Sequence, residues 1–450
     1  MLLQNLAAVS AIAGIAAGAS LPFPASSHGS HGQSPLITQD PQQIIYDVRR
    51  FHVDSRGELD EILRHAKSHD LDVWRVTRDD VDIYFPESST IPNIFQSKNS
   101  TALSPSWTPI SPVTTLANHP YPTIGTWNLT TIHNCSFHNS FHDWLDIHSF
   151  MQQMAEDYPD VVRVVRIGRT AEGRDIVGLD IGIRERNKKG KPKNWRKHRT
   201  VIQGAQHARE WIATSTALYF AHSLLVNKKE RGSMTKLLER MDFTIIPVPN
   251  PDGYVYTWEH ERLWYKNRQD VVGGGGKCKG LDLNRNWGYE WEPASDHKVC
   301  TEWYPGEHAF EALETRAISS YLKWTPNIRA FIDLRSYGQL IMHPFSHSCK
   351  AHPKDEENLI EAGLGMAKAL TKKHGTHMIA GSLCDKLYSA GGNIIDWVYA
   401  EAKVSVAYSV MLRDTGTYGF LLPATMIRPV GEETADMVAY LAKWIKTRKP

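Results

Sequence analysis

The sequence predicts an α/β domain with a mixed, mostly parallel central sheet and helices on both faces, preceded by a small α+β domain. From about residue 140 to the C-terminus, short apolar runs typical of buried strands alternate with long amphipathic stretches. Between residues 43 and 85, a strand, a helix and two further strands follow one another closely. At 450 residues the chain is long enough to give each domain its own core.

The N-terminal residues predict a signal peptide over 1–19. The apolar run Leu6–Ala17 is too short to span a bilayer, and Ala17-Gly18-Ala19 supplies a small-residue cleavage site. Residues 20–42 are rich in Pro, Ser, His and Gly, which predicts a disordered lead. A net charge of +2 with no basic stripe argues against nucleic acid, and no later segment is apolar enough for a membrane anchor. We expect a secreted or vacuolar monomer.

The small domain is predicted over 43–85. Its strands are expected at 44–53, 71–76 and 81–85, and its helix, with apolar residues on one side, at 58–68. A Ser/Thr/Pro-rich linker is predicted over 86–122. Because no Lys or Arg stands between Lys98 and Arg163, a protease that cuts after basic residues would find almost no site there.

The large domain is predicted over 123–450. An amphipathic helix is expected at 143–158 and a helix with few breakers at 211–226, and the chain closes with a helix at 432–446. The predicted strands are 161–167, 175–183, 200–202, 243–248, 328–334 and 404–412.

Five cysteines in a secreted chain predict two disulfides and one unpaired thiol. Cys278 with Cys300 and Cys349 with Cys384 are the favoured pairs, although spacing alone does not settle the connectivity. Cys135 would then be unpaired. Three Asn-x-Ser/Thr triplets, which also arise by chance, are candidate glycosylation sites at Asn99, Asn128 and Asn134.

The stretch Gly204–Trp211 carries the main chemical signal. His207 and Glu210 stand three residues apart where a predicted strand turns into a predicted helix, so both side chains can face one point. A His nitrogen and a Glu oxygen at this spacing can each bind one Zn²⁺. A bare H-x-x-E is a weak signal, because His308 and Glu311 repeat it by apparent accident.

Several further segments, in their order and rough spacing, strengthen that signal. With the stretch above, they resemble the zinc metallocarboxypeptidases that carry a pancreatic-type pro-domain. The resemblance covers residues 127–450 and, more weakly, 43–88. The matching stretches are His207–Trp211, Asn250–Tyr254, Asp282–Trp287, Phe331–Leu334, Ser336-Tyr337, Ile395–Trp397 and Arg413–Phe420.

This resemblance implies a metallocarboxypeptidase-like domain behind a ferredoxin-like pro-domain. It implies one Zn²⁺ site, with His207 and Glu210 as two of its three ligands. It also implies a set of residues around the free carboxylate of a bound peptide, and the apolar Ile395 where the family sets side-chain preference. The implied substrate-binding residues are Arg209, Asn284, Arg285, Ser336, Tyr337, Tyr388 and Ile395.

Three positions depart from the family pattern. The third zinc ligand falls on Arg335, which has no lone pair to give and whose charge repels the metal by roughly 6 kcal/mol at about 5 Å. Met411 stands at the position of the catalytic base, a role that a thioether cannot perform. Tyr265 replaces the arginine that stabilises the oxyanion, and it offers one neutral hydrogen bond instead.

Neighbouring residues could replace the missing zinc ligand or the missing arginine only if the chain shifted locally. His343 and His347 follow Arg335 closely and are alternative metal ligands. Lys266 stands beside Tyr265, but adjacent residues in a strand point to opposite sides.

The leading hypothesis is therefore an inactive relative that binds peptide or protein C-termini, with Zn²⁺ weakly bound or absent and no catalytic residue. The resemblance extends to the fungal inactive metallocarboxypeptidase-like proteins linked to cell-wall organisation, and that role is implied by resemblance alone. One alternative is an active or weakly active zinc carboxypeptidase that releases C-terminal apolar residues. Another is a scaffold that uses its outer surface or its retained pro-domain.

Overall fold

The computed structural model describes residues 44–85, 91–96, 98, 100–103, 106–107, 127–183, 197–276, 278–294 and 299–448. The predicted signal peptide, the predicted lead to residue 42, much of the predicted linker and Asn99 lie outside the described residues.

The small domain is an antiparallel sheet with one long helix. The helix α1 (Arg56–Ser68) begins at Ser55, whose side chain accepts a hydrogen bond from the Glu58 amide, and it buries Leu59, Ile62 and Ala66. The strands pair in the order β3-β4-β2-β5, which is the ferredoxin-like order. The strands and short helix are β1 (Ile44–Ile45), β2 (Asp47–His52), β3 (Asp72–Val76), β4 (Asp80–Phe85), α2 (Asn93–Gln96), β5 (Ser100–Ala102) and β6 (Ser106–Trp107).

The small domain continues past residue 85, the boundary expected from the sequence. Strand β5 pairs with β2 in the four-stranded sheet, and strand β6 pairs with β1 in a separate two-stranded sheet. Both β5 and β6 come from the stretch predicted as linker. All three residues of β5 are exposed, so the strand has no apolar alternation by which a sequence pattern could reveal it.

The large domain is built on an eight-stranded mixed sheet in the order β13-β12-β14-β11-β9-β10-β8-β7. Pairing is parallel among its central strands, from β10 through β9 and β11 to β14, and antiparallel where β8 meets β10 and β12 meets β14. The predicted fold class is thereby confirmed. The strands are β7 (Val162–Arg169), β8 (Asp175–Ile181), β9 (His198–Gln203), β10 (Met241–Ile246), β11 (Ile328–Arg335), β12 (Leu340–His343), β13 (Ile379–Ser382) and β14 (Val406–Met411).

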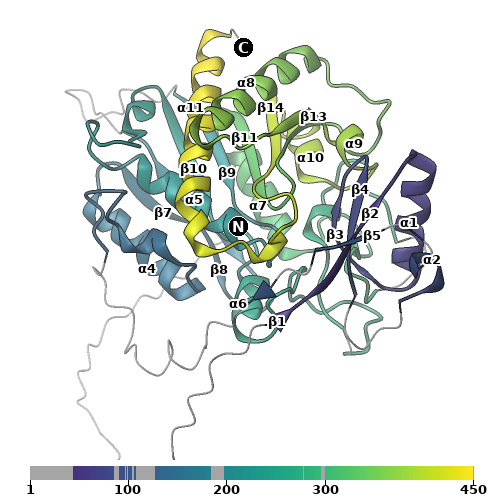
Figure 1. The fold of residues 1–450 in the computed structure, drawn as a ribbon. Helices are drawn as coiled ribbons and strands as arrows, with labels where there is room; N and C mark the ends of the chain where they lie inside the picture. The colour runs from purple at the N-terminus through teal and green to yellow at the C-terminus, as the bar shows by residue number, and fades with distance from the viewer. Residues whose placement is uncertain are drawn as a thin grey trace, which may run out of the picture. The chain divides into compact units, whose positions relative to one another are not determined.

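Helices cover both faces of this sheet because the side chains of its central strands alternate between two apolar cores. In β9, Ile202 belongs to one core and Val201 to the other. Helices α5, α8 and α11 pack together over the first face (Figure 1). Helices α7 and α10 line the second core. The long helices are α4 (Trp144–Asp157), α5 (Trp211–Ser223), α6 (Pro251–Glu259), α7 (Leu313–Trp324), α8 (Glu356–His374), α10 (Ile394–Ala400) and α11 (Ile427–Thr447), and α9 (Leu383–Lys386) is one turn.

The carboxyl ends of β9, β11 and β14 lie side by side because these strands are parallel neighbours. The chain leaves β9 through Gly204, where a Cβ atom would lie 2.2 Å from the Pro247 carbonyl oxygen. Only glycine permits this close approach. The turn that begins at Gly204 places His207 at the carboxyl ends of the strands. In α/β sheets, ligands bind at this edge.

Both predicted disulfides are present, Cys278–Cys300 and Cys349–Cys384, and Cys135 is a buried free thiol. Among the described residues, we find no helix that combines the length and the apolar character needed to cross a membrane.

Candidate functional site

His207 and Glu210 meet between the end of β9 and the start of α5. Glu210 is the residue that precedes the first turn of α5, and both side chains are almost fully buried. Nε2 of His207 lies 2.9 Å from Oδ1 of Asp282, which fixes the ring and turns Nδ1 toward Oε1 of Glu210, 3.2 Å away. The two residues therefore face one point, as their spacing predicts.

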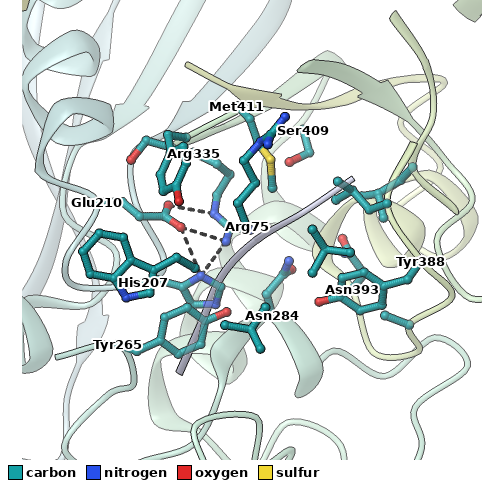
Figure 2. Close-up of a pocket in the computed structure, with 18 of the residues that line it drawn as sticks. Arg75, His207, Glu210, Tyr265, Asn284, Arg335, Tyr388, Asn393, Ser409 and Met411 are labelled. Atoms are coloured by element: carbon teal, nitrogen blue, oxygen red, sulfur yellow. Dashed lines mark hydrogen bonds and ion pairs between the residues drawn. The ribbon is translucent and has the colours of Figure 1, made fainter. Parts of the chain in front are cut away.

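Arg335 is the last residue of β11, and its guanidinium lies at the point that His207 and Glu210 face. Its Nε donates to Oε2 of Glu210 at 2.8 Å, and its Nη2 donates to Oε1 at 2.9 Å and also contacts Nδ1 of His207 (Figure 2). Burial alone would raise the pKa of Glu210, but the charge of Arg335 and the hydrogen bonds from Arg335 and His207 together outweigh burial, and the pKa falls below its usual value. Glu210 is therefore an ionised partner of the arginine.

These residues do not fit a catalytic zinc ion. Such a site takes three protein donors, whereas Arg335 carries only N–H groups and occupies the donor atoms of the other two residues. The alternative histidines are directed elsewhere: Nδ1 of His343 contacts the Pro344 carbonyl at 2.6 Å, and Nδ1 of His347 contacts Asp396 at 3.1 Å.

Met411 and Tyr265, the other two departures from the family pattern, line the same cavity as Arg335. Met411 is the register partner of Arg335 across the β14–β11 pair, and its thioether lies on the cavity wall beside Ser409 (Figure 2). The ring of Tyr265 stacks on His207 with their centroids 3.6 Å apart. Burial raises the pKa of Tyr265 well above its usual value, so its hydroxyl stays protonated. Lys266 points away and donates to the Thr301 carbonyl at 2.9 Å.

Residues expected around a carboxylate gather on the facing wall. Nη2 of Arg285 donates to the Tyr388 hydroxyl at 2.5 Å, and Nη1 donates to the Asn284 carbonyl at 3.0 Å. The Asn284 side-chain oxygen accepts from the Ile394 amide at 3.1 Å. Together with Ser336 and Tyr337, these residues line a cavity of about 70 Å³.

Two residues of the expected set lie outside the cavity wall. Ile395 is fully buried in the core on the α10 side of the sheet, behind the wall. The buried Arg209 forms a two-point ion pair with the partly exposed Asp72 of the small domain, with Nη1–Oδ2 at 2.5 Å and Nη2–Oδ1 at 2.9 Å. This arginine is therefore already bound to a carboxylate.

The small domain supplies part of the cavity, which the sequence did not reveal. Residues 73–76 of β3 line it, and among them Arg75 lines the same cavity as Met411 and Arg335 (Figure 2). Asp82 of β4 accepts a hydrogen bond from the Tyr337 hydroxyl at 2.9 Å. Trp74 packs on Phe420 with ring centroids 5.2 Å apart. The partners of these contacts are distant in sequence, so no local pattern marks them.

The second H-x-x-E pair forms no site. Nδ1 of His308 contacts the neighbouring Ala309 carbonyl at 3.0 Å, and Glu311 accepts from the Glu307 amide at 2.5 Å. His308 is exposed. The H-x-x-E spacing of His308 and Glu311 therefore does not bring the two side chains into one site.

Fold and site define an α/β protein of the metallopeptidase class, with a His–Glu pair at the turn from strand to helix and arginines around a small cavity. Residues 147–437 match the profile of a family described as zinc carboxypeptidase. The chain belongs to the zinc carboxypeptidase family.

Two curated relatives carry names that describe them as inactive. The chain is 38% identical over 317 residues to the inactive metallocarboxypeptidase ecm14 of Sclerotinia sclerotiorum, a match that covers 66% of this chain and 52% of the relative. It is 37% identical over 318 residues to the inactive metallocarboxypeptidase ECM14 of Ajellomyces capsulatus, with the same shares covered. The chain spans about half the length of these relatives.

Solved structures show the same fold, including the small domain. Thrombin activatable fibrinolysis inhibitor is 27% identical with a TM-score of 0.74, over 90% of this chain and 100% of that chain. Carboxypeptidase A from Helicoverpa armigera is 25% identical with a TM-score of 0.74, over 89% and 98%. The predicted arrangement of a small α+β domain before an α/β domain is thus shared with carboxypeptidases.

Proposed function

We propose that this protein is a catalytically inactive zinc-carboxypeptidase relative that binds the C-terminus of a peptide or protein without cleaving it. The observation that carries the proposal is the pairing of Arg335 with Glu210 beside an intact Arg285, Asn284 and Tyr388 wall. The names of the relatives, which describe inactive metallocarboxypeptidases, agree with it.

The absence of catalysis follows from the chemistry of three side chains. Arg335 contributes a charge in place of a metal donor. Met411 cannot accept the proton of an attacking water, and the loss of a general base lowers rates by about 10²–10⁴-fold. Tyr265 leaves a neutral donor where the family places a charged one. Each loss removes a different requirement of amide hydrolysis, so none compensates for another.

Binding of a carboxylate is supported by the charges on the cavity wall. Arg285 presents a planar fork suited to two-point carboxylate binding, and its Tyr388 partner holds it in place. Arg75 of β3 also lines the cavity, but its Nη1 lies 3.6 Å from Asp80 and 4.0 Å from Asp82, so carboxylates of the small domain already offset its charge. Because Arg209 is paired with Asp72, we assign the ligand carboxylate to Arg285 rather than to Arg209.

The test is the affinity of the full chain for peptide pairs that differ only in a free or an amidated C-terminus. We expect the free form of a Leu-terminated peptide to bind at least about tenfold more tightly, because a charge-assisted pair is lost on amidation. Arg285→Gln should remove this preference. Arg49→Gln is the control, because Arg49 is part-exposed and pairs with Asp47. Equal affinity for both peptides would overturn the proposal.

We further propose that Zn²⁺ is weakly held or absent, and that the chain passes through the secretory pathway to a secreted or vacuolar location. The two disulfides support an oxidising compartment. Asn128 and Asn134 are exposed, as glycosylation requires. A role in cell-wall organisation and a monomeric state remain expectations.

A further inference from the structure

A free thiol and two imidazoles come together at the opposite end of α5 from Glu210. Cys135, His138 and His222 are 0%, 1% and 0% exposed. One ligand atom of each residue lies within 4.8 Å of those of the other two. Cys135 is the cysteine that remains free beside the two disulfides. None of the three residues lines the carboxylate cavity, so this cluster is independent of the proposed function.

Local structure brings the three side chains together. Cys135 precedes the 3₁₀ turn Ser136–Asn139, in which residues three apart lie above one another, so Cys135 and His138 share a side. His222 enters from the last turn of α5. The rings of Phe150 and Tyr219 pack on His138, at centroid distances of 5.7 and 4.9 Å, and enclose the cluster.

Hydrogen bonds fix the protonation of the two rings. Nε2 of His222 contacts the Leu129 carbonyl at 3.0 Å, and because a carbonyl only accepts, this nitrogen carries the proton. Nδ1 of His222 is left with a lone pair, 3.0 Å from Nε2 of His138. Burial lowers the pKa of His222 to about 4, in agreement with a neutral ring.

We propose that Cys135, His138 and His222 form a three-coordinate binding site for a soft monovalent cation, Cu(I). Thiolate and imidazole are ligands that copper takes. The thiolate charge cancels that of Cu(I), so the buried site stays neutral, whereas Zn²⁺ would leave one uncompensated charge. The nearby Arg428 guanidinium, which donates to the Cys135 carbonyl at 2.6 Å, disfavours a divalent ion further.

The binding step balances in protons and needs no redox partner. The Cys135 thiol releases its proton to solvent, and His138 moves its proton from Nε2 to Nδ1. Nε2 of His138, Nδ1 of His222 and the thiolate then each supply one electron pair. With metal–nitrogen and metal–sulfur bonds of about 2.0 and 2.3 Å, the two nitrogens must separate to about 3.5 Å and the sulfur must approach by about 1 Å at most. Side-chain torsions supply shifts of this size.

The test is a titration of the purified full chain with Cu(I) under nitrogen, in competition with the chelator bicinchoninate. We expect one Cu(I) per chain. Cys135→Ser and His222→Asn should each weaken binding by more than about 100-fold, since each removes one of three ligands. His308→Asn is the control and should leave Cu(I) affinity unchanged, because His308 is exposed and lies outside this cluster.

X-ray absorption on the wild-type complex decides the matter even if the variants fold poorly. We expect one sulfur and two nitrogen neighbours around copper. Absence of stoichiometric binding, binding that survives Cys135→Ser, or a copper environment without sulfur would each overturn the proposal and leave a purely structural hydrogen-bonded histidine pair.

Discussion

The guanidinium of Arg335 and the carboxylate of Glu210 form a buried two-point ion pair, with Nε–Oε2 at 2.8 Å and Nη2–Oε1 at 2.9 Å. Arg335 is 5% and Glu210 1% exposed, so water cannot stabilise either charge if its partner is removed. The pair thus places a positive charge against the carboxylate oxygens of Glu210, and it links the start of α5 to the end of β11.

Two substitutions of Arg335 should separate two reasons for weak Zn²⁺ binding, which are the positive charge of the arginine and its lack of a lone pair. Arg335→Gln removes the positive charge without adding a good metal donor, whereas Arg335→His removes the charge and adds one. We expect Arg335→His to bind Zn²⁺ more than about 100-fold more tightly than the wild type, and Arg335→Gln to gain much less. Competition with a zinc-sensitive dye measures both. Tight stoichiometric zinc in the wild-type protein would contradict this account.

Loss of the same arginine should also weaken the fold. Arg335→Gln leaves the buried carboxylate of Glu210 without its guanidinium partner, and the loss of one partner from a buried pair costs about 3–5 kcal/mol. Urea unfolding of the wild type and the variant measures the difference. Added Zn²⁺ should restore part of the lost stability in Arg335→His and much less of it in Arg335→Gln. An unchanged unfolding midpoint for Arg335→Gln would show that the pair is not a stabilising element.

The ion pair between Asp72 and Arg209 should hold the small domain on the large one. Arg209 is 1% exposed, so Asp72→Asn leaves a buried guanidinium without its ionic partner. We expect the variant to lose about 3–5 kcal/mol of stability and to become more susceptible to proteolysis near residue 85. Asp47→Asn breaks the part-exposed pair with Arg49 and is the matched control, with a loss below about 1 kcal/mol. Equal effects of the two substitutions would refute the assignment.

A buried carboxyl group away from the site should make stability depend on pH. Burial raises the pKa of Glu314 to about 7 from its usual value of 4.5, with the Asn267 amide donating to it at 2.8 Å. Between these two pH values the folded state holds a proton that the unfolded state releases, so this group's contribution to stability falls as pH rises through that range.

The corresponding variant removes the titrating group and keeps the amide partner. The free energy of unfolding of Glu314→Gln should therefore fall less than that of the wild type between pH 4.5 and 7. The difference between the two falls should be about 3 kcal/mol at most. Urea unfolding of both proteins at several pH values measures it. Parallel curves for wild type and variant would mean that Glu314 does not titrate in this range.

The sequence predicted those parts of the molecule that rest on local patterns. The strands ending at Gln203, Arg335 and Met411 followed from apolar runs, and the turn carrying His207 and Glu210 from its position before a helix. Strand β5 could not be predicted, because its three residues are all exposed.

The contacts of the small domain were also beyond the sequence. The Asp72–Arg209 pair joins residues 137 apart in the chain, and it depends on how two folded surfaces dock. Arg209 consequently binds a carboxylate of its own chain, whereas the resemblance implied a carboxylate of a bound peptide.

The central claim is that this cavity binds the C-terminal carboxylate of a peptide but cannot hydrolyse the adjacent peptide bond. The most direct test incubates the purified full chain with a peptide ending in Leu and follows both binding and the released amino acid by mass spectrometry. The account predicts saturable binding that is lost on amidation, with no release of Leu. Release of Leu at an ordinary enzymatic rate, abolished by a chelator and by His207→Ala, would contradict it.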